Sequence, residues 1–167
     1  MKTTLAAFGL VALIGAAGAP AHAAERTYLD RFLGSWSGTA TVIDNDRPMN
    51  VSCRVTGAPD DNHISIRGHC NAGFIGRAVS AELDYDPKTG RYTGTYVGDD
   101  VGPARLSGKR SGNTVRLTIT WPKPVNGDTV AKMTIVNTGN GTLKITLDDK
   151  PRAGAMVART DFVLSQI

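Results

Sequence analysis

The fold of this chain is decided by the stretch Phe32-Leu33-Gly34-Ser35-Trp36-Ser37-Gly38. A short amphipathic segment, residues 28–33, leads into it, and a Gly-x-Trp then opens the first segment in which apolar and polar residues alternate. Alternation with a period of two is the pattern of a half-buried β-strand. It recurs from Ser35 to the C-terminus, so we expect a short helical turn followed by an all-β domain.

Ten segments have the alternation of strands, and turn residues separate them. Most of the turn segments are short, as at Asp44–Asp46 and Asp86–Gly90, so sequential strands are expected to pair as antiparallel hairpins. The expected strands are Ser35–Ile43, Met49–Thr56, His63–Cys70, Gly76–Tyr85, Arg91–Val97, Ala104–Lys109, Thr114–Trp121, Thr129–Val136, Thr142–Leu147 and Met156–Leu164.

One face of these strands is apolar, and the other carries Thr, Ser and charged residues. Antiparallel sheets with one face in water have this pattern. Ten strands in one open sheet would leave two long unpaired edges, which closure into a barrel removes. Two sheets packed as a sandwich are the alternative. Because the connections are nearly all hairpins, we expect a single up-and-down antiparallel β-barrel.

Residues 1–23 have the layout of a secretory signal peptide, with Lys2, an apolar run over Leu5–Gly18 and an Ala-x-Ala pattern ending at Ala23. A membrane anchor is the alternative, but it needs about 20 apolar residues. Cleavage after Ala23 would leave residues 24–167 as one periplasmic or secreted domain, with no further stretch long enough to span a bilayer. Loss of Lys2 lowers the net charge from +4 to +3, too small an excess to indicate nucleic-acid binding.

The two cysteines, Cys53 and Cys70, are interpreted as one disulfide bond, as is usual for a cysteine pair in an exported protein. They fall on the same inner face of adjacent expected strands, where opposite Cβ atoms come close to bonding distance. A zinc or redox site is the alternative, but there is no Cys-x-x-Cys, and only His63 and His69 remain as partners. Closing this loop would stabilise the fold by about 3 kcal/mol.

The pattern Phe32-x-Gly34-x-Trp36, placed before the first of ten strands, resembles the N-terminal signature of the lipocalin/calycin family. The strand number is more similar to the fatty-acid-binding and nitrobindin-like branches than to the eight-stranded lipocalins. The resemblance implies that Trp36 closes the barrel floor and that a basic residue near the chain end, here Arg159, packs across it. Haem-binding members of the nitrobindin-like branch use a histidine near the C-terminus. This chain has none after His69, so no haem and no other cofactor is expected.

Patterns of catalytic or metal-binding residues are weak in this sequence. The run Gly34–Gly38 has its serines at the wrong positions for a nucleophile elbow. Asp44–Asp46 and Asp99-Asp100 lack the length and the distal glutamate of a calcium loop. His63 and His69 lie on the expected outer face and are interpreted as solvated. We therefore expect no metal site and a protein that is not an enzyme.

The expected interior mixes small residues with aliphatic and aromatic ones. Such a lining suits a cavity for a small apolar or amphipathic ligand, although large neighbours that fill the gaps would leave a solid core instead. The candidate ligand-lining residues are Trp36, Ala40, Ile66, Ala81, Tyr92, Tyr96, Leu106, Leu117, Met133 and Phe162.

The expected outer face of the sixth to ninth strands carries a row of basic residues beside the loop Trp121–Val125. Such a row suits contact with an anionic envelope component or a protein partner, and a solvated face that limits aggregation is the alternative. The candidate surface contacts are Arg105, Arg116, Trp121, Lys132 and Lys144.

Overall fold

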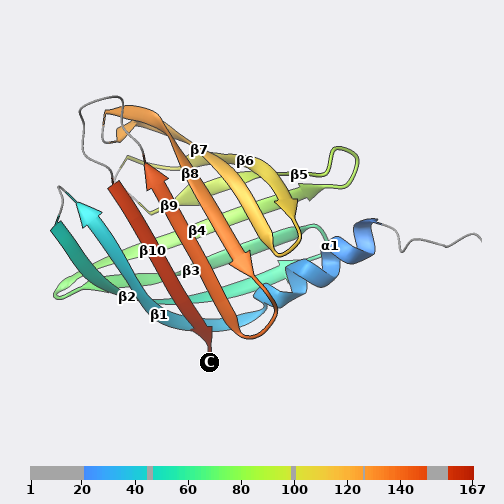
Figure 1. The fold of residues 1–167 in the computed structure, drawn as a ribbon, viewed down its shortest axis with the longest axis horizontal. Coiled ribbons are helices and arrows are strands. Elements are labelled where there is room, and N and C mark those ends of the chain that lie inside the picture. Colours follow the sequence, from blue (N-terminus) through green and yellow to red (C-terminus); the bar gives the residue numbers. More distant parts are fainter. Residues whose placement is uncertain (1–20, 45–46, 99–100, 126, 150–157) are drawn as a thin grey trace, which may run out of the picture.

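The computed structural model describes residues 21–44, 47–98, 101–125, 127–149 and 158–167. Over these ranges the chain forms one α-helix, one 3₁₀ turn and ten strands (Figure 1). The elements are α1 (Ala21–Leu29), η1 (Asp30–Phe32), β1 (Gly34–Asp44), β2 (Arg47–Asp60), β3 (His63–Ala72), β4 (Ile75–Asp86), β5 (Arg91–Val97), β6 (Ala104–Ser111), β7 (Thr114–Val125), β8 (Asp128–Asn137), β9 (Thr142–Asp149) and β10 (Ala158–Gln166).

Each strand pairs antiparallel with the next, and β10 pairs with β1, so the sheet closes into a barrel. The expected fold class, a ten-stranded up-and-down barrel, is confirmed. Most strands extend beyond their expected bounds, because the hairpin ladders continue into the turn segments. Strand β7 continues to Val125, with an irregular register to β8 after Thr120. The expected start of the last strand, Met156, lies outside the described residues, as do Asn45, Asp46 and Asp99-Asp100.

The helical segment is longer than the expected single turn, because α1 already begins at Ala21. An alanine-rich start favours helix. The expected cleavage site after Ala23 falls in the first turn of α1, and residues 1–20 lie outside the described ranges. Among the residues that the structure describes, no helix has the length and apolar character needed to cross a membrane.

Helix α1 and turn η1 cover one end of the barrel, which we call the closed end (Figure 1). Tyr28, Leu29 and Phe32 are buried there. The indole nitrogen of Trp36 donates a hydrogen bond to the backbone oxygen of Phe32 at 3.1 Å, and Arg31 donates to Asn113 Oδ1 at 2.8 Å in the β6–β7 turn. The first strand and a distant hairpin thus hold the helical segment in place.

A buried ion pair also fixes α1 to the barrel wall. The carboxylate of Glu25 accepts hydrogen bonds from Arg110 Nε at 2.7 Å and Nη2 at 2.6 Å, and from the Tyr92 hydroxyl. The guanidinium of Arg110 lies 4.7 Å from the centre of the Tyr28 ring. The hydrogen bonds to Glu25 raise the pKa of Arg110, and burial, followed by the bond to Glu25, raises the pKa of Tyr92.

Two glycines of the strands, Gly38 and Gly94, lie in close contact with the backbone of a neighbouring strand. A Cβ atom at Gly38 would collide with the backbone oxygen of Val163, and one at Gly94 with that of Glu82. Glycines at such points let strands bend sharply and approach closely. At Gly38 and Gly94, therefore, the missing side chain leaves no free space, whereas the small residue Ala81 does line a cavity.

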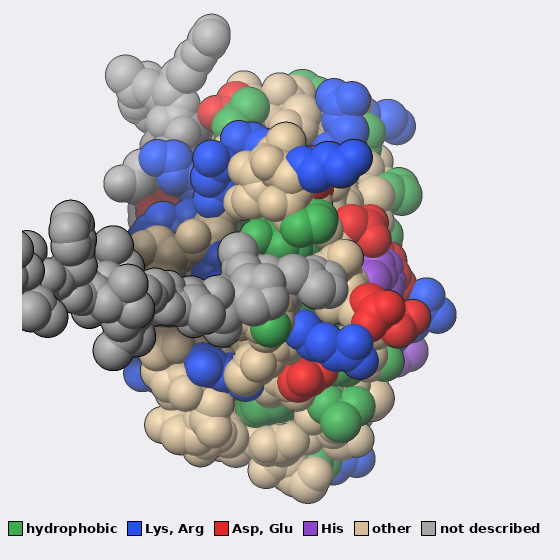
Figure 2. Space-filling model, turned by 90° about the vertical axis from the view of Figure 1, so that its right-hand side faces the viewer, with side chains coloured by type: hydrophobic (Ala, Val, Ile, Leu, Met, Phe, Trp, Pro, Cys, Tyr) green, Lys and Arg blue, Asp and Glu red, His purple; other side chains and the backbone are tan. Residues whose placement is uncertain are grey.

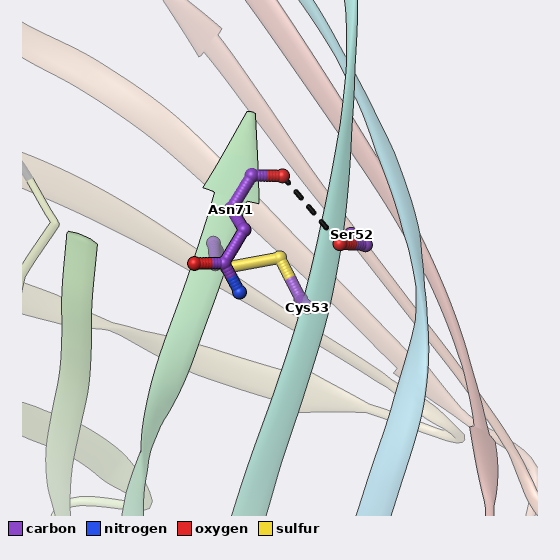
Figure 3. The surroundings of a disulfide bond; sticks show 4 residues. Ser52, Cys53 and Asn71 are labelled. Carbon is purple, nitrogen blue, oxygen red and sulfur yellow. Dashed lines mark hydrogen bonds between the residues drawn. A yellow bond between two sulfur atoms is a disulfide. The ribbon is translucent and has the colours of Figure 1, made fainter. Parts of the chain in front are cut away.

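The disulfide between Cys53 and Cys70 is present and joins β2 to β3 (Figure 3). The two residues are directly opposite in the strand register, and both are buried. Next to the bond, the Ser52 hydroxyl donates to the Asn71 backbone oxygen at 3.5 Å. The pairing predicted from the alternation is confirmed.

Arg159 does not pack across Trp36. It is opposite Ile43, at the end of the barrel away from Trp36, and its guanidinium pairs with Asp161 at 2.6 Å. Trp36 is instead opposite Gln166. Thr160 and Phe162 line the interior, so Arg159 points outward from β10. The role implied by the family resemblance is therefore wrong for this residue.

Candidate functional site

A cavity of about 540 Å³ lies inside the barrel at the end opposite α1, which we call the mouth. Residues on both sides of the β1–β2 hairpin, such as Val42 and Met49, line it, whereas the other ends of these two strands meet Phe32 at the closed end. Inward-facing residues of seven further strands complete the lining. They include Val79, Tyr96, Trp121, Ala131, Leu147 and Phe162.

A second cavity of about 70 Å³ extends this space toward the middle of the barrel. The two cavities share several lining residues, among them Cys70, Val79 and Phe162, and the smaller one is lined mainly by apolar side chains. The disulfide therefore forms part of the wall where the two spaces meet. Beyond it the interior is packed with side chains.

Five of the ten candidate lining residues contact these cavities, and the other five lie in the packed core. Ile66, Ala81, Tyr96, Met133 and Phe162 line one or both spaces. The remaining five line neither cavity and are buried in the core, and one of them, Ala40, is opposite the cavity-lining Val51 and Phe162. The five are Trp36, Ala40, Tyr92, Leu106 and Leu117. Alternation shows which side chains face the barrel interior, but it does not show how far along the barrel axis a residue lies.

Polar groups are few in the lining and concentrate toward the mouth. Arg77 on β4, Asp149 at the end of β9 and Thr160 on β10 are among them, and Asp149 is buried. None of these three residues was among the lining residues predicted from the sequence. The sequence feature that could have identified them is their position near the strand ends that lie away from the N-terminal helix. An apolar chamber with charged and hydroxyl groups toward one end suits a ligand with an apolar body and a polar end.

Trp121 is part of this cavity and does not form a surface contact. Its side chain is only 7% exposed, and its ring meets that of Tyr96 edge-on with centroids 6.1 Å apart. It continues the inward series of β7 after Leu117 and Ile119. The neighbouring prolines suggested an exposed loop, but β7 extends through them, so the prediction of a surface role for Trp121 is wrong.

The four basic candidates, Arg105, Arg116, Lys132 and Lys144, are exposed on the outer wall. Arg116 is opposite Lys109 on the neighbouring strand, which places two positive charges side by side. Within the described part of the chain no hydrogen bond or ion pair involves these four side chains. We call this surface the basic wall.

A second polar cluster lies on the outer face of β3 and β4, away from the cavity. His63 Nδ1 is 2.8 Å from Asp84 Oδ1, and its Nε2 is 3.0 Å from Glu82 Oε2. Arg67 and Ser65 both donate to Glu82 Oε1. Figure 2, which looks onto the closed end, shows histidine and acidic side chains gathered on one side of the molecule. His63 is therefore paired with two carboxylates, and the prediction that it is solvated is corrected in this respect.

The pKa values in this cluster shift in opposite directions. The hydrogen bond to Asp84 is the main cause that raises the pKa of His63. Partial burial raises the pKa of Glu82, but the hydrogen bonds from Arg67 and Ser65 outweigh it and lower that pKa below its usual value. Among the described residues no group of three potential ligands is placed to hold a metal ion.

Replacing His63 with glutamine is expected to destabilise the protein more at about pH 5 than at about pH 8. Because the pKa of His63 is raised in the folded state, its contribution is fully present below the unfolded pKa and is lost as pH rises through the folded value. The difference should stay below about 1 kcal/mol, since the cluster is partly exposed. Urea denaturation of both proteins at the two pH values measures it.

The His69→Gln variant is the matched control, because His69 lies on the same strand but is opposite Arg54 and Ala78. An equal loss of stability at both pH values in His63→Gln would contradict the proposed charge coupling.

Comparison with known proteins shows the fold and no closer relationship. No known protein family matches the sequence, and no curated protein matches it. The structure is similar to the crystal structure of Rv2717c from M. tuberculosis, with a TM-score of 0.63 and 17% sequence identity over 84% of this chain and 96% of that one. This likeness shows a shared barrel fold, and the calycin-like family assignment stays a prediction.

Proposed function

We propose that this protein is an exported, non-enzymatic β-barrel that binds a small apolar or amphipathic molecule in the mouth cavity. The observation that carries this proposal is the cavity of about 540 Å³, with its mainly apolar lining and a polar group such as Thr160 near its outer end. Ligand pockets for small molecules have volumes of about 300–1,000 Å³ and linings of this composition.

Two features support the exported state that we propose. The disulfide between Cys53 and Cys70 is typical of proteins in oxidising compartments. Among the α1 side chains that the structure describes, from Ala23 onward, the first that is buried is Glu25, which lies beyond the expected cleavage site. Cleavage there would therefore keep the ion pair with Arg110 that fixes the helix.

The proposal of a binding protein over an enzyme rests on where the polar groups lie. His63 forms hydrogen bonds with Glu82 and Asp84, and this cluster of titratable side chains lies on the outer wall. General acid–base catalysis needs such groups within hydrogen-bonding reach of the substrate. A ligand in the mouth cavity would be enclosed mainly by Val, Leu, Ile and aromatic side chains.

Replacing Val79 with tryptophan is expected to weaken ligand binding about tenfold or more, equivalent to about 1.4 kcal/mol or more. Val79 lines both cavities, so the larger side chain would occupy the space where they join. Titration with a fluorescent long-chain fatty acid, followed by displacement with unlabelled lipid, measures the affinity.

The Val163→Trp variant is the matched control, because Val163 is an exposed valine on β10. Its affinity should equal that of the unmodified protein. Failure of the unmodified protein to bind any probe, or equal affinities for both variants, would contradict the proposal.

A second candidate function is an envelope interaction module that acts through the basic wall. It is favoured by the exposure of its four cations and by the like-charged pair of Arg116 and Lys109, whose repulsion a bound anion would relieve. A variant with glutamine at all four positions of the basic wall removes this surface, and it is included in the experiment on anionic vesicles below.

A further inference from the structure

We infer that the mouth of the barrel is a docking surface for an anionic lipid bilayer, with the side chain of Phe74 as the inserted group. The inference concerns the outer rim of the mouth, so it holds whether or not a ligand occupies the cavity.

Phe74 lies at the tip of the hairpin between β3 and β4. Ala72 pairs with Ile75, which leaves Gly73 and Phe74 as a two-residue turn, and Gly73 has the positive φ of 60° that such turns favour. The Phe74 side chain is fully exposed, and that of Ile75 is 72% exposed. A tight turn between two long paired strands therefore holds an aromatic ring out in solvent.

A third apolar side chain lies close to this tip. The β2–β3 register pairs Ser52 with Asn71, so the start of β2 runs alongside the hairpin tip, and Met49 on that segment is 46% exposed. Met49 and Ile75 both line the mouth cavity. We call Met49, Phe74 and Ile75 the rim patch. It is continuous with the apolar lining inside the barrel.

Two exposed arginines flank the rim patch on the chain, and they suit contact with an anionic surface. Arg47 precedes Met49 by two residues, and Arg77 follows Ile75 by two. Lys123 and Arg159 are further exposed basic residues at this end, and Arg159 pairs with Asp161, whose side chain is 43% exposed.

Apolar side chains surrounded by Lys and Arg are the pattern of proteins that bind the interface of anionic membranes. The apolar groups enter the boundary between head groups and acyl chains, and each cation near the surface adds to the attraction. A bilayer explains both features together, because it offers a negative surface above an apolar layer. Docked in this way, the mouth cavity would face the bilayer, and an apolar ligand would pass between them without crossing water.

The test is co-sedimentation of the full chain with vesicles of phosphatidylcholine alone or mixed with phosphatidylglycerol. We expect binding to the mixed vesicles that weakens as salt is raised, and much weaker binding to phosphatidylcholine alone. Replacing Phe74 with serine should weaken binding about tenfold or more, as expected for the loss of one buried aromatic side chain. Phe74 is fully exposed, so the variant should keep the stability of the unmodified protein.

Two control variants identify the surface that binds. Leu33→Ser removes an exposed apolar side chain at the closed end and should leave vesicle binding unchanged. The four-glutamine variant of the basic wall should retain most of its binding. Loss of binding in that variant, with none in Phe74→Ser, would overturn the proposal and assign the membrane contact to the wall.

A second readout does not depend on a loss of function. Phe74→Trp should gain fluorescence emission that brominated phosphatidylglycerol quenches, relative to the background from the buried Trp36 and Trp121. Absence of quenching would overturn the proposal. So would a change from dimer to monomer on Phe74→Ser in sedimentation, without an effect on vesicle binding, because the rim patch would then be an interface between two copies of the chain.

Failure of this proposal and failure of the proposed ligand binding are distinguishable. Phe74 does not line the cavity, so Phe74→Ser should bind the fluorescent fatty acid as the unmodified protein does, while Val79→Trp should bind vesicles normally.

Discussion

Replacement of Glu25 with alanine is expected to lower the free energy of unfolding by about 3 kcal/mol. The substitution leaves the Arg110 guanidinium, whose side chain is 20% exposed, without its carboxylate partner, and it removes the acceptor for the Tyr92 hydroxyl. Removal of one partner from a buried ion pair costs more than the pair itself contributes, because the remaining charge stays desolvated. Urea denaturation followed by tryptophan fluorescence measures the loss.

Three further variants show whether the buried charge is the cause. Arg26→Ala breaks the exposed ion pair between the same helix and Asp61, and it should cost less than about 1 kcal/mol. In the Glu25→Ala background, Arg110→Met should restore part of the stability by removing the unpaired charge. Glu25→Gln should have an intermediate effect, since an amide oxygen still accepts from Tyr92. A loss in Glu25→Ala no larger than that in Arg26→Ala would show that α1 is held by its apolar side chains alone.

Replacement of both cysteines with alanine is also expected to cost about 3 kcal/mol. The bond between Cys53 and Cys70 closes a separation of 17 residues, and its loss increases the conformational entropy of the unfolded chain. Both residues are buried on the inner face, so alanine keeps the site apolar. Urea denaturation of the double variant and of the unmodified protein measures the difference.

Reduction provides the control for this second prediction. Dithiothreitol should lower the stability of the unmodified protein by a similar amount and should leave the double variant unchanged. A loss below about 1 kcal/mol would mean that pairing of β2 with β3 in the unfolded chain already restricts this segment.

The strand number, the inward faces and the disulfide were predictable because each follows from a pattern with a period of two. In β5 the alternation of Tyr92 and Tyr96 with threonines gave the bounds Arg91–Val97 that the structure has. In β2 and β3 the same alternation placed both cysteines inside. These are local regularities, and closure of the barrel follows from the requirement that no strand edge stay unpaired.

The cavity, the ion pair and the rim patch were not predictable in this way. Position along the barrel axis depends on how far α1 and η1 fill the closed end, which no local pattern records. The role of Glu25 could not be predicted from its local sequence, because its partner Arg110 is 85 residues away. Phe74 gave no alternation signal, since a turn residue belongs to neither face of the sheet.

Arg159 and Trp121 show two other limits of reading a sequence. The role of Arg159 was taken from a family pattern, and the β1–β10 register overrides it by placing this residue at the mouth. For Trp121 the adjacent prolines indicated a loop, but the inward parity of β7 determines the direction of its side chain.

Closure of the barrel by β1 and β10 has a practical consequence for the orientation of the molecule. The backbone nitrogen of Ile167 donates to the Ser35 oxygen at 2.9 Å, so the chain leaves the barrel at the end that α1 covers (Figure 1). A carrier, tag or solid support joined after Ile167 would therefore lie at the closed end, away from the mouth. Immobilised in this way, every molecule would present its rim patch and cavity outward, as a uniformly oriented layer accessible to vesicles and ligands.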